Sequence, residues 1–65
     1  MQVKVNGRPE RLTPCTIADL VHRKGLDTEA LVVEHNLTIV RQDQWAATAL
    51  RDGDTLELLS FVGGG

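Results

Sequence analysis

Residues 16–25 carry the clearest helix pattern in the chain, and this single helix constrains the fold more than any other feature. Thr16 predicts the N-cap, and Asp19 follows three residues later in a variant of the capping box. Gly25 supplies a residue that can turn left-handed after the last turn. The apolar stripe between these signals consists of Ile17, Leu20 and Val21. We therefore expect a helix over about residues 17–24 with one buried face.

The N-terminal segment predicts a β-hairpin. Residues 2–5 alternate polar and apolar side chains, as in a half-buried strand. Asn6-Gly7 follows, and this pair is a strong hairpin signal because both residues tolerate a positive φ. Residues 8–12 form the expected return strand. Because Pro9 has no N–H to donate, we expect that strand to lie at a sheet edge.

The segment after the helix predicts three further strands. Residues 31–35 and 38–40 are rich in β-branched side chains, and a turn begins between them at Asn36. Residues 51–54 read as a tight turn, because aspartate and glycine dominate such turns. The last strand is expected over residues 55–61.

Residues 41–50 predict a short helix or 3₁₀ turn, with Asp43 as its expected cap. Trp45 is expected to cover one side of a small sheet, since a lone tryptophan in a small domain more often packs than binds. The complete pattern predicts an α+β fold: a mixed four- to five-stranded sheet with one main helix packed across one face. We expect one domain over residues 1–62 and a flexible glycine tail over residues 63–65.

Composition excludes several alternatives. The chain has 65 residues and one cysteine, Cys15, so an internal disulfide is impossible. Neither His22 nor His35 is spaced with that cysteine as in a zinc site, and no nucleophile–base pair or phosphate loop is present. We therefore expect no metal site and no catalytic residues. The net charge of −2 argues against nucleic acid, and the absence of a long apolar run or signal-peptide pattern predicts a cytoplasmic protein without membrane contact.

The last strand separates two kinds of residue. Leu56 and Leu58 alternate onto one face, which we expect to be the core. Leu59 and Phe61 fall on the opposite face with Glu57. Apolar side chains on an outer face suggest a contact surface for a partner. A β-bulge that turns Leu59 inward is an equal alternative.

Three glycines, Gly63-Gly64-Gly65, follow this strand. A tail without side chains can extend from a folded body and enter a channel too narrow for any Cβ, which makes the carboxylate of Gly65 a candidate reactive group. The alternative is a frayed terminus, and the glycines alone favour that alternative.

Taken together, these stretches resemble a known family over essentially the whole chain. They are Val3-Lys4-Val5-Asn6-Gly7, Thr16-Ile17-Ala18-Asp19-Leu20, Val32-Val33-Glu34-His35-Asn36, Ile39-Val40, Gln44-Trp45, Asp52-Gly53-Asp54 and the terminal Gly-Gly. Their combination resembles ThiS, the sulfur carrier family of thiamine biosynthesis, whose members are ubiquitin-like β-grasp proteins. No one of these motifs is specific alone.

The resemblance implies a covalent carrier rather than an enzyme, with no bound cofactor of its own. An E1-like enzyme would use ATP and magnesium to adenylate Gly65. Sulfur from a cysteine desulfurase persulfide would then give a thiocarboxylate, and thiazole synthase would take up that sulfur. Gly63 and Gly64 would thread into the partner's active site. The expected partner-binding residues are Leu59, Phe61 and Val62.

Other functions remain open from the sequence alone. The related sulfur carrier of molybdopterin synthesis shares the fold and tail, although the tight first hairpin here and the approach Ser60-Phe61-Val62 favour the thiamine branch. A carrier for another sulfur product is also possible. A non-covalent β-grasp module of the TGS type is a different class, which the acidic balance disfavours for RNA and which salt-dependent RNA binding would reveal. A small structural subunit is the third possibility.

Overall fold

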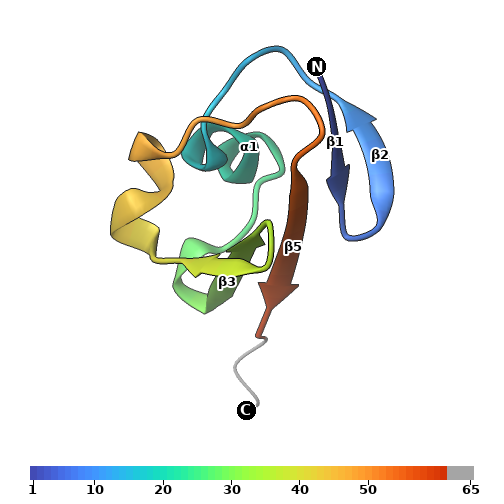
Figure 1. Ribbon diagram of the computed structural model, residues 1–65. Helices are drawn as coiled ribbons and strands as arrows, with labels where there is room; N and C mark the ends of the chain where they lie inside the picture. The colour runs from blue at the N-terminus through green and yellow to red at the C-terminus, as the bar shows by residue number, and fades with distance from the viewer. Residues whose placement is uncertain (62–65) are drawn as a thin grey trace.

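The computed structural model describes residues 1–61 as one helix packed against one mixed sheet (Figure 1). The elements in chain order are β1 (Gln2–Val5), β2 (Arg8–Arg11), α1 (Ile17–Arg23), η1 (Thr28–Ala30), β3 (Leu31–His35), β4 (Thr38–Val40), η2 (Gln42–Ala47) and β5 (Thr55–Ser60), where η marks a 3₁₀ helix. The strands are ordered β2-β1-β5-β3-β4. β1 and β5 are parallel, whereas the other neighbours are antiparallel. The predicted fold class is confirmed, with five strands in the described part of the chain.

The predicted helix signals act as expected. Thr16 is the N-cap of α1 and its Oγ1 accepts from the backbone N–H of Asp19 at 3.2 Å. In return, the N–H of Thr16 donates to Asp19 Oδ2 at 3.0 Å, which completes the capping box. The hydrogen bond from the Thr16 backbone to the carboxylate, followed by the contribution of the Thr16 side chain, holds the pKa of Asp19 below its ordinary value. Gly25 follows the C-cap at φ +65°. The three residues of the apolar stripe are buried, so α1 covers the inner face of the sheet.

Two tight turns build the sheet. Asn6 and Gly7 have φ angles of +51° and +80°, which joins β1 to β2 as predicted. Pro9 lies in β2, an edge strand, where its missing N–H costs no ladder hydrogen bond. The β3–β4 turn also uses two left-handed residues, Asn36 at +50° and Leu37 at +72°. The leucine was not predicted at such an angle, which disfavours side chains with a Cβ.

Trp45 is buried and its indole Nε1 donates to the carbonyl of Val40 at 2.9 Å, so the predicted covering role is confirmed. The predicted cap of η2 is wrong. The N-cap is Arg41, which makes no side-chain cap hydrogen bond, and the helix starts at Gln42. Asp43 is therefore already inside the first turn, and its carboxylate faces Arg41 at 3.5 Å on the surface.

β5 alternates between core and surface without a bulge. Leu56 and Leu58 are buried among the core residues, whereas Leu59 is exposed. The ladder with β3 runs without interruption from the Leu31–Ser60 pair to the His35–Leu56 pair. The alternative in which a bulge turns Leu59 inward is therefore wrong.

Within residues 1–61, no helix has the length and apolarity needed to cross a membrane. The same part of the chain contains no group of three or more histidine, cysteine, aspartate or glutamate side chains arranged to hold a metal ion.

Candidate functional site

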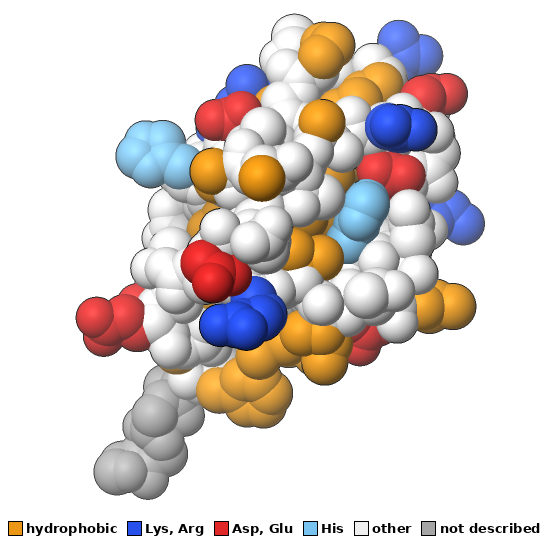
Figure 2. Space-filling view, turned by 60° about the vertical axis from the view of Figure 1, so that its left-hand side comes forward, with side chains coloured by type: hydrophobic (Ala, Val, Ile, Leu, Met, Phe, Trp, Pro, Cys, Tyr) orange, Lys and Arg blue, Asp and Glu red, His pale blue; other side chains and the backbone are white. Residues whose placement is uncertain are grey.

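The apolar surface at the end of β5 is the candidate site. Leu59 is 44% exposed, Phe61 is 60% exposed and Ile39 of β4 is 65% exposed. Val32 of β3 lies directly opposite Leu59 on the same face. We call these four side chains the outer patch: Val32, Ile39, Leu59 and Phe61. In the space-filling view, hydrophobic side chains gather along the lower edge of the molecule (Figure 2).

The outer patch combines predicted and unpredicted residues. Leu59 and Phe61 were expected on the outer face, and their exposure confirms that placement. The outward position of Ile39 was not predicted from the sequence. The alternation of side chains along a strand could have indicated it, because Val40 packs against the core and the preceding residue must point outward. The partner-binding role itself stays a prediction. Val62, Gly63, Gly64 and Gly65 lie outside the described residues.

The backbone is held in the sheet up to the start of the tail. The N–H of Phe61 donates to the carbonyl of Ala30 at 2.7 Å, one residue beyond the end of the strand. β5 lies between β1 and β3 (Figure 1): β1 pairs with Thr55 and Leu56, and β3 pairs with the strand from Leu56 to Ser60. A fixed strand therefore leads directly into the last four residues of the sequence.

The Asn6 side chain fixes β5 from the hairpin side. Its Oδ1 accepts from the N–H of Leu58 at 2.7 Å, and its Nδ2 donates to the carbonyl of the same residue at 3.3 Å. Its own backbone N–H donates to the carbonyl of Leu56 at 2.9 Å. The side chain thus satisfies a backbone donor and acceptor that lie beyond the two paired residues of the parallel ladder, Lys4 and Val5. The sequence predicted only the turn role of this asparagine.

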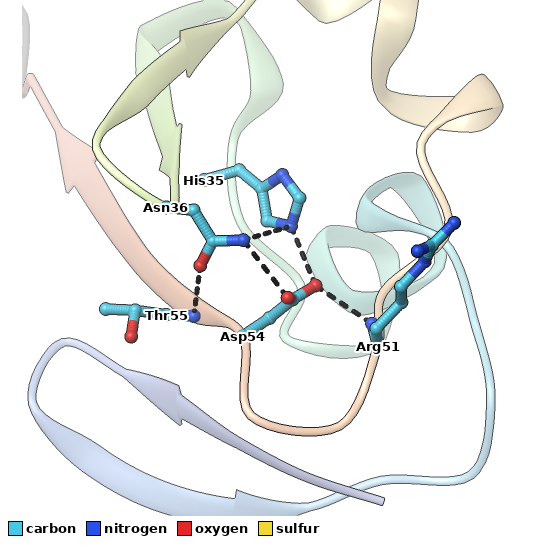
Figure 3. Close-up of polar contacts among 5 residues, drawn as sticks. All are labelled: His35, Asn36, Arg51, Asp54 and Thr55. Carbon is cyan, nitrogen blue, oxygen red and sulfur yellow. Dashed lines mark hydrogen bonds and ion pairs between the residues drawn. The ribbon is translucent and has the colours of Figure 1, made fainter.

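A polar cluster fixes the other end of β5 (Figure 3). Asp54 is buried, and one of its oxygens, Oδ2, lies 2.7 Å from His35 Nε2 and 2.9 Å from the N–H of Arg51. Its Oδ1 accepts from Asn36 Nδ2 at 3.1 Å. The Asn36 carbonyl oxygen Oδ1 accepts from the N–H of Thr55 at 2.9 Å. The β3–β4 turn and the start of β5 are therefore joined through one carboxylate.

The pKa of Asp54 results from opposing effects. Burial raises it, because the charged form loses hydration. Hydrogen bonds from His35, from the Arg51 backbone and from Asn36, followed by the charge of the imidazole ring, lower it further than burial raises it. The net pKa lies below the ordinary value of an aspartate. His35 and Asp54 therefore have a structural role, because the Asp54 carboxylate joins His35, Asn36 and the backbone of Arg51.

The remaining candidates also have structural positions. Cys15 is a buried free cysteine in the core. Asp52 Oδ1 accepts from the N–H of Gln2 at 2.7 Å, which explains this aspartate as a turn residue. Lys24 forms an ion pair with Glu10 at 2.8 Å. His22 is exposed on α1.

Fold and site together define a class of protein: a small β-grasp domain with an apolar outer face, whose described residues contain no metal-binding group of three or more side chains. The comparison with protein families defines it further, since residues 3–65 match the ThiS family. The chain therefore belongs to the ThiS family, a family of sulfur carriers rather than of enzymes.

Relatives and solved structures agree with this assignment. The chain is 36% identical over 50 aligned residues to the sulfur carrier protein ThiS of Bacillus subtilis, covering 77% of this chain and 76% of that protein. A crystal structure of the thiamine biosynthesis protein ThiS from Geobacter metallireducens superposes with a TM-score of 0.86 at 30% identity, covering 100% of both chains.

Two further relatives are much longer proteins. The chain is 36% identical over 66 aligned positions to a thiazole synthase of Paramagnetospirillum magneticum, which covers 100% of this chain and 20% of that protein. A thiazole synthase of Magnetococcus marinus matches at 30% identity with the same coverage. This chain thus spans about a fifth of the length of these two relatives. In both, a domain similar to this one is part of a protein named for thiazole synthesis.

Proposed function

We propose that this chain carries sulfur for thiamine thiazole synthesis and that the sulfur is bound at the carboxylate of Gly65. Membership of the ThiS family supports the carrier role. The observation that carries the proposal is the position of two exposed apolar residues, Leu59 and Phe61, at the end of a fixed strand immediately before the last four residues of the sequence. A partner that binds this surface has the terminal carboxylate within reach.

The proposed chemistry begins with activation, because a carboxylate is a poor electrophile. An E1-like enzyme attaches the carboxylate oxygen of Gly65 to the α-phosphorus of ATP and releases pyrophosphate, which leaves an acyl-adenylate. Sulfur from the persulfide of a cysteine desulfurase then displaces AMP, and a thiol reduces the resulting acyl disulfide to the thiocarboxylate. The thiocarboxylate sulfur is nucleophilic in its ionised form.

Each part of the chain has a separate role in this proposal. Leu59, Phe61 and Val62 bind the partner, and Gly63 and Gly64 pass through its active-site channel. Glycine suits this passage because no Cβ has to be accommodated. A closed channel also excludes water, which would hydrolyse the adenylate. ATP and magnesium belong to the activating enzyme, so the carrier needs no cofactor of its own.

The proposed partners follow from this sequence of steps. They are the E1-like activating enzyme, a sulfur donor such as a cysteine desulfurase, and thiazole synthase, which takes up the sulfur. The two long relatives support the last of these, because each contains a domain similar to this chain in a protein named thiazole synthase. We propose a cytoplasmic reaction, since its ATP is a cytoplasmic reactant, and we propose no nucleic acid or membrane partner.

Intact-mass measurement tests the proposal. The chain is incubated with the E1-like enzyme of the same genome, ATP, magnesium and a sulfur donor. We expect a mass gain equal to one oxygen replaced by one sulfur, confined to the C-terminal peptide. An unchanged mass, under conditions in which the enzyme is active on a carrier that it is known to modify, would contradict the carrier function.

Two tail variants separate the carboxylate from the folded body. Deletion of Gly65 and the substitution Gly64→Trp should each abolish the mass gain, because the first shortens the tail and places the terminal carboxylate one residue nearer the fold, and the second blocks the channel. Both should unfold at the same denaturant concentration as the unmodified chain. A deletion variant that is still adenylated would show that the reaction does not require the carboxylate at position 65.

A further inference from the structure

Two glutamates face each other on the outer surface of the sheet. Glu34 of β3 lies directly opposite Glu57 of β5 in the antiparallel ladder. Both side chains are half-buried. Directly opposed residues in such a ladder have Cβ atoms about 4.5–5.5 Å apart, so the two side chains leave the sheet as near neighbours.

This arrangement is unfavourable for the isolated domain. Like charges directly opposite each other destabilise a sheet. Within residues 1–61 neither glutamate takes part in an ion pair. Lys4 of β1 and Arg11 of β2 are basic side chains on the same face, and neither forms an ion pair in the described part of the chain. The fold therefore keeps a repulsion that no described residue neutralises.

The outer patch surrounds this acidic pair. The next residue pair along the ladder on the same face is Val32 with Leu59, and Ile39 of β4 lies opposite Glu34 on the other side. In the space-filling view an acidic side chain lies among the hydrophobic ones at the lower edge of the molecule (Figure 2). A protein that covers the apolar residues must also cover the carboxylates.

A partner that covers the two carboxylates must supply a positive charge to neutralise them. A charge removed from water without a counter-charge is costly, and the cost rises as the surroundings become drier. A cationic side chain placed between the two glutamates removes their repulsion and replaces their hydration. Guanidinium fits best, because its planar fork of donors can bond to two carboxylates at once.

We propose that the outer patch is the docking surface for thiazole synthase and that a basic side chain of the synthase, most simply an arginine, lies across Glu34 and Glu57. This inference rests on the sulfur-carrier function proposed above. The choice of thiazole synthase follows from the two relatives in which a domain similar to this chain belongs to a thiazole synthase, so the two are joined in one protein. The outer patch continues to the end of β5, which brings the docked strand next to the tail that delivers sulfur.

A binding titration with thiazole synthase from the same genome tests the proposal on the full-length chain. The double variant Glu34→Gln, Glu57→Gln should bind about tenfold more weakly or worse, since each charge-assisted hydrogen bond at an interface contributes about that much. The charge reversal Glu57→Lys should bind more weakly still, because the new lysine repels the partner's cation and pairs with Glu34. Added salt should weaken the unmodified chain more than the double variant.

A matched control isolates the position of the charges from their number. The variant Glu29→Gln, Asp43→Asn removes two negative charges from exposed sites outside the sheet face, in η1 and η2. Its affinity for the synthase should stay within about twofold of the unmodified chain. Thermal unfolding supplies a second control: the glutamine double variant should melt at the same temperature or higher, because it loses a repulsion rather than a contact.

Each outcome decides something. If the unmodified chain and the glutamine double variant bind the synthase with equal affinity, the proposed cation is wrong. If the control variant loses as much affinity as the glutamine double variant, the effect is general charge attraction, and the proposed cation is wrong as well. A loss confined to the activating enzyme would overturn the choice of synthase. The sulfur mass gain is measured separately on the same samples. If the unmodified chain never gains sulfur, the carrier function fails, whatever the glutamates do to binding.

Discussion

The two faces of β5 differ in almost every respect, although their residues alternate along one strand of six residues. Leu56 and Leu58 point inward, where α1 and Trp45 enclose them in the core. Glu57 and Leu59 point outward, where no described element covers them. The inner residues therefore determine whether the domain folds, and the outer residues are available for a partner.

This division shows how a very small domain can combine stability with recognition. A chain of 65 residues has one core and few surfaces to spare. Successive side chains of a strand point to opposite faces of the sheet, so one face can pack in the core while the other binds a partner. A substitution on one face therefore leaves the other face nearly unchanged. The two ends of β5 differ as well, since the Asp54 cluster fixes the start and the end leads into the tail. Substitutions on each face and at the fixed start test whether the tasks are separate.

The largest expected effect on stability comes from the inner face. Leu56 is 0% exposed, so Leu56→Ala should leave a cavity and lower the free energy of unfolding by about 2–5 kcal/mol. A loss of this size is large for a domain whose total stability is about 5–15 kcal/mol at most. Chemical denaturation monitored by the fluorescence of Trp45 measures it. An unchanged midpoint would show that the faces of β5 are assigned the wrong way round.

Much of this architecture could be predicted from the sequence because the signals were local. The capping box at Thr16, the left-handed pair Asn6-Gly7 and the alternation of leucines in the last strand each act within a few residues. The orientation of Leu59 was undecided between surface and bulge. It depends on the register between β3 and β5, which is set by residues more than twenty positions apart.

The unpredicted features all involve partners distant in sequence or unfavourable local geometry. Asn6 bonds Leu58 across 52 positions, and no local pattern predicts such a contact. Leu37 adopts a left-handed angle that its own side chain disfavours. The opposed pair Glu34 and Glu57 appears only when two strands are placed in register. Asp43 was predicted to cap η2, but the N-cap is Arg41, two residues earlier.

An intermediate effect is expected at the fixed start of β5. Asp54→Asn keeps the shape of the side chain but removes its charge, and one of its two terminal atoms becomes a donor that faces the donors of Arg51, His35 or Asn36. We expect a loss of about 1–3 kcal/mol in the free energy of unfolding. The measurement is denaturant unfolding at pH 7, with Asp43→Asn as a control at an exposed aspartate in η2.

The same carboxylate predicts a pH dependence with a definite sign. The folded-state pKa of Asp54 is lower than its unfolded value of about 3.9, so the folded state binds this proton less readily. Its contribution is complete above the unfolded pKa and is lost as the pH falls toward the folded pKa. Stability should therefore decrease below about pH 4 in the unmodified chain. Asp54→Asn should lose less stability over this range, and an identical acid limb in both proteins would contradict the assignment.

The smallest expected effect on stability comes from the outer face. Leu59 is 44% exposed and contacts its cross-strand neighbour Val32, so Leu59→Ala should change the free energy of unfolding by less than about 1 kcal/mol. Its effect on partner binding should be larger, because full burial of a leucine side chain contributes about 1.5–3 kcal/mol. We expect adenylation by the activating enzyme to require a higher carrier concentration, with the maximum rate nearly unchanged, since the carboxylate of Gly65 is intact. Steady-state kinetics over a range of carrier concentrations separates the two quantities. A variant that unfolds easily, or one that is adenylated as efficiently as the unmodified chain, would show that the two faces of β5 do not divide stability and recognition between them.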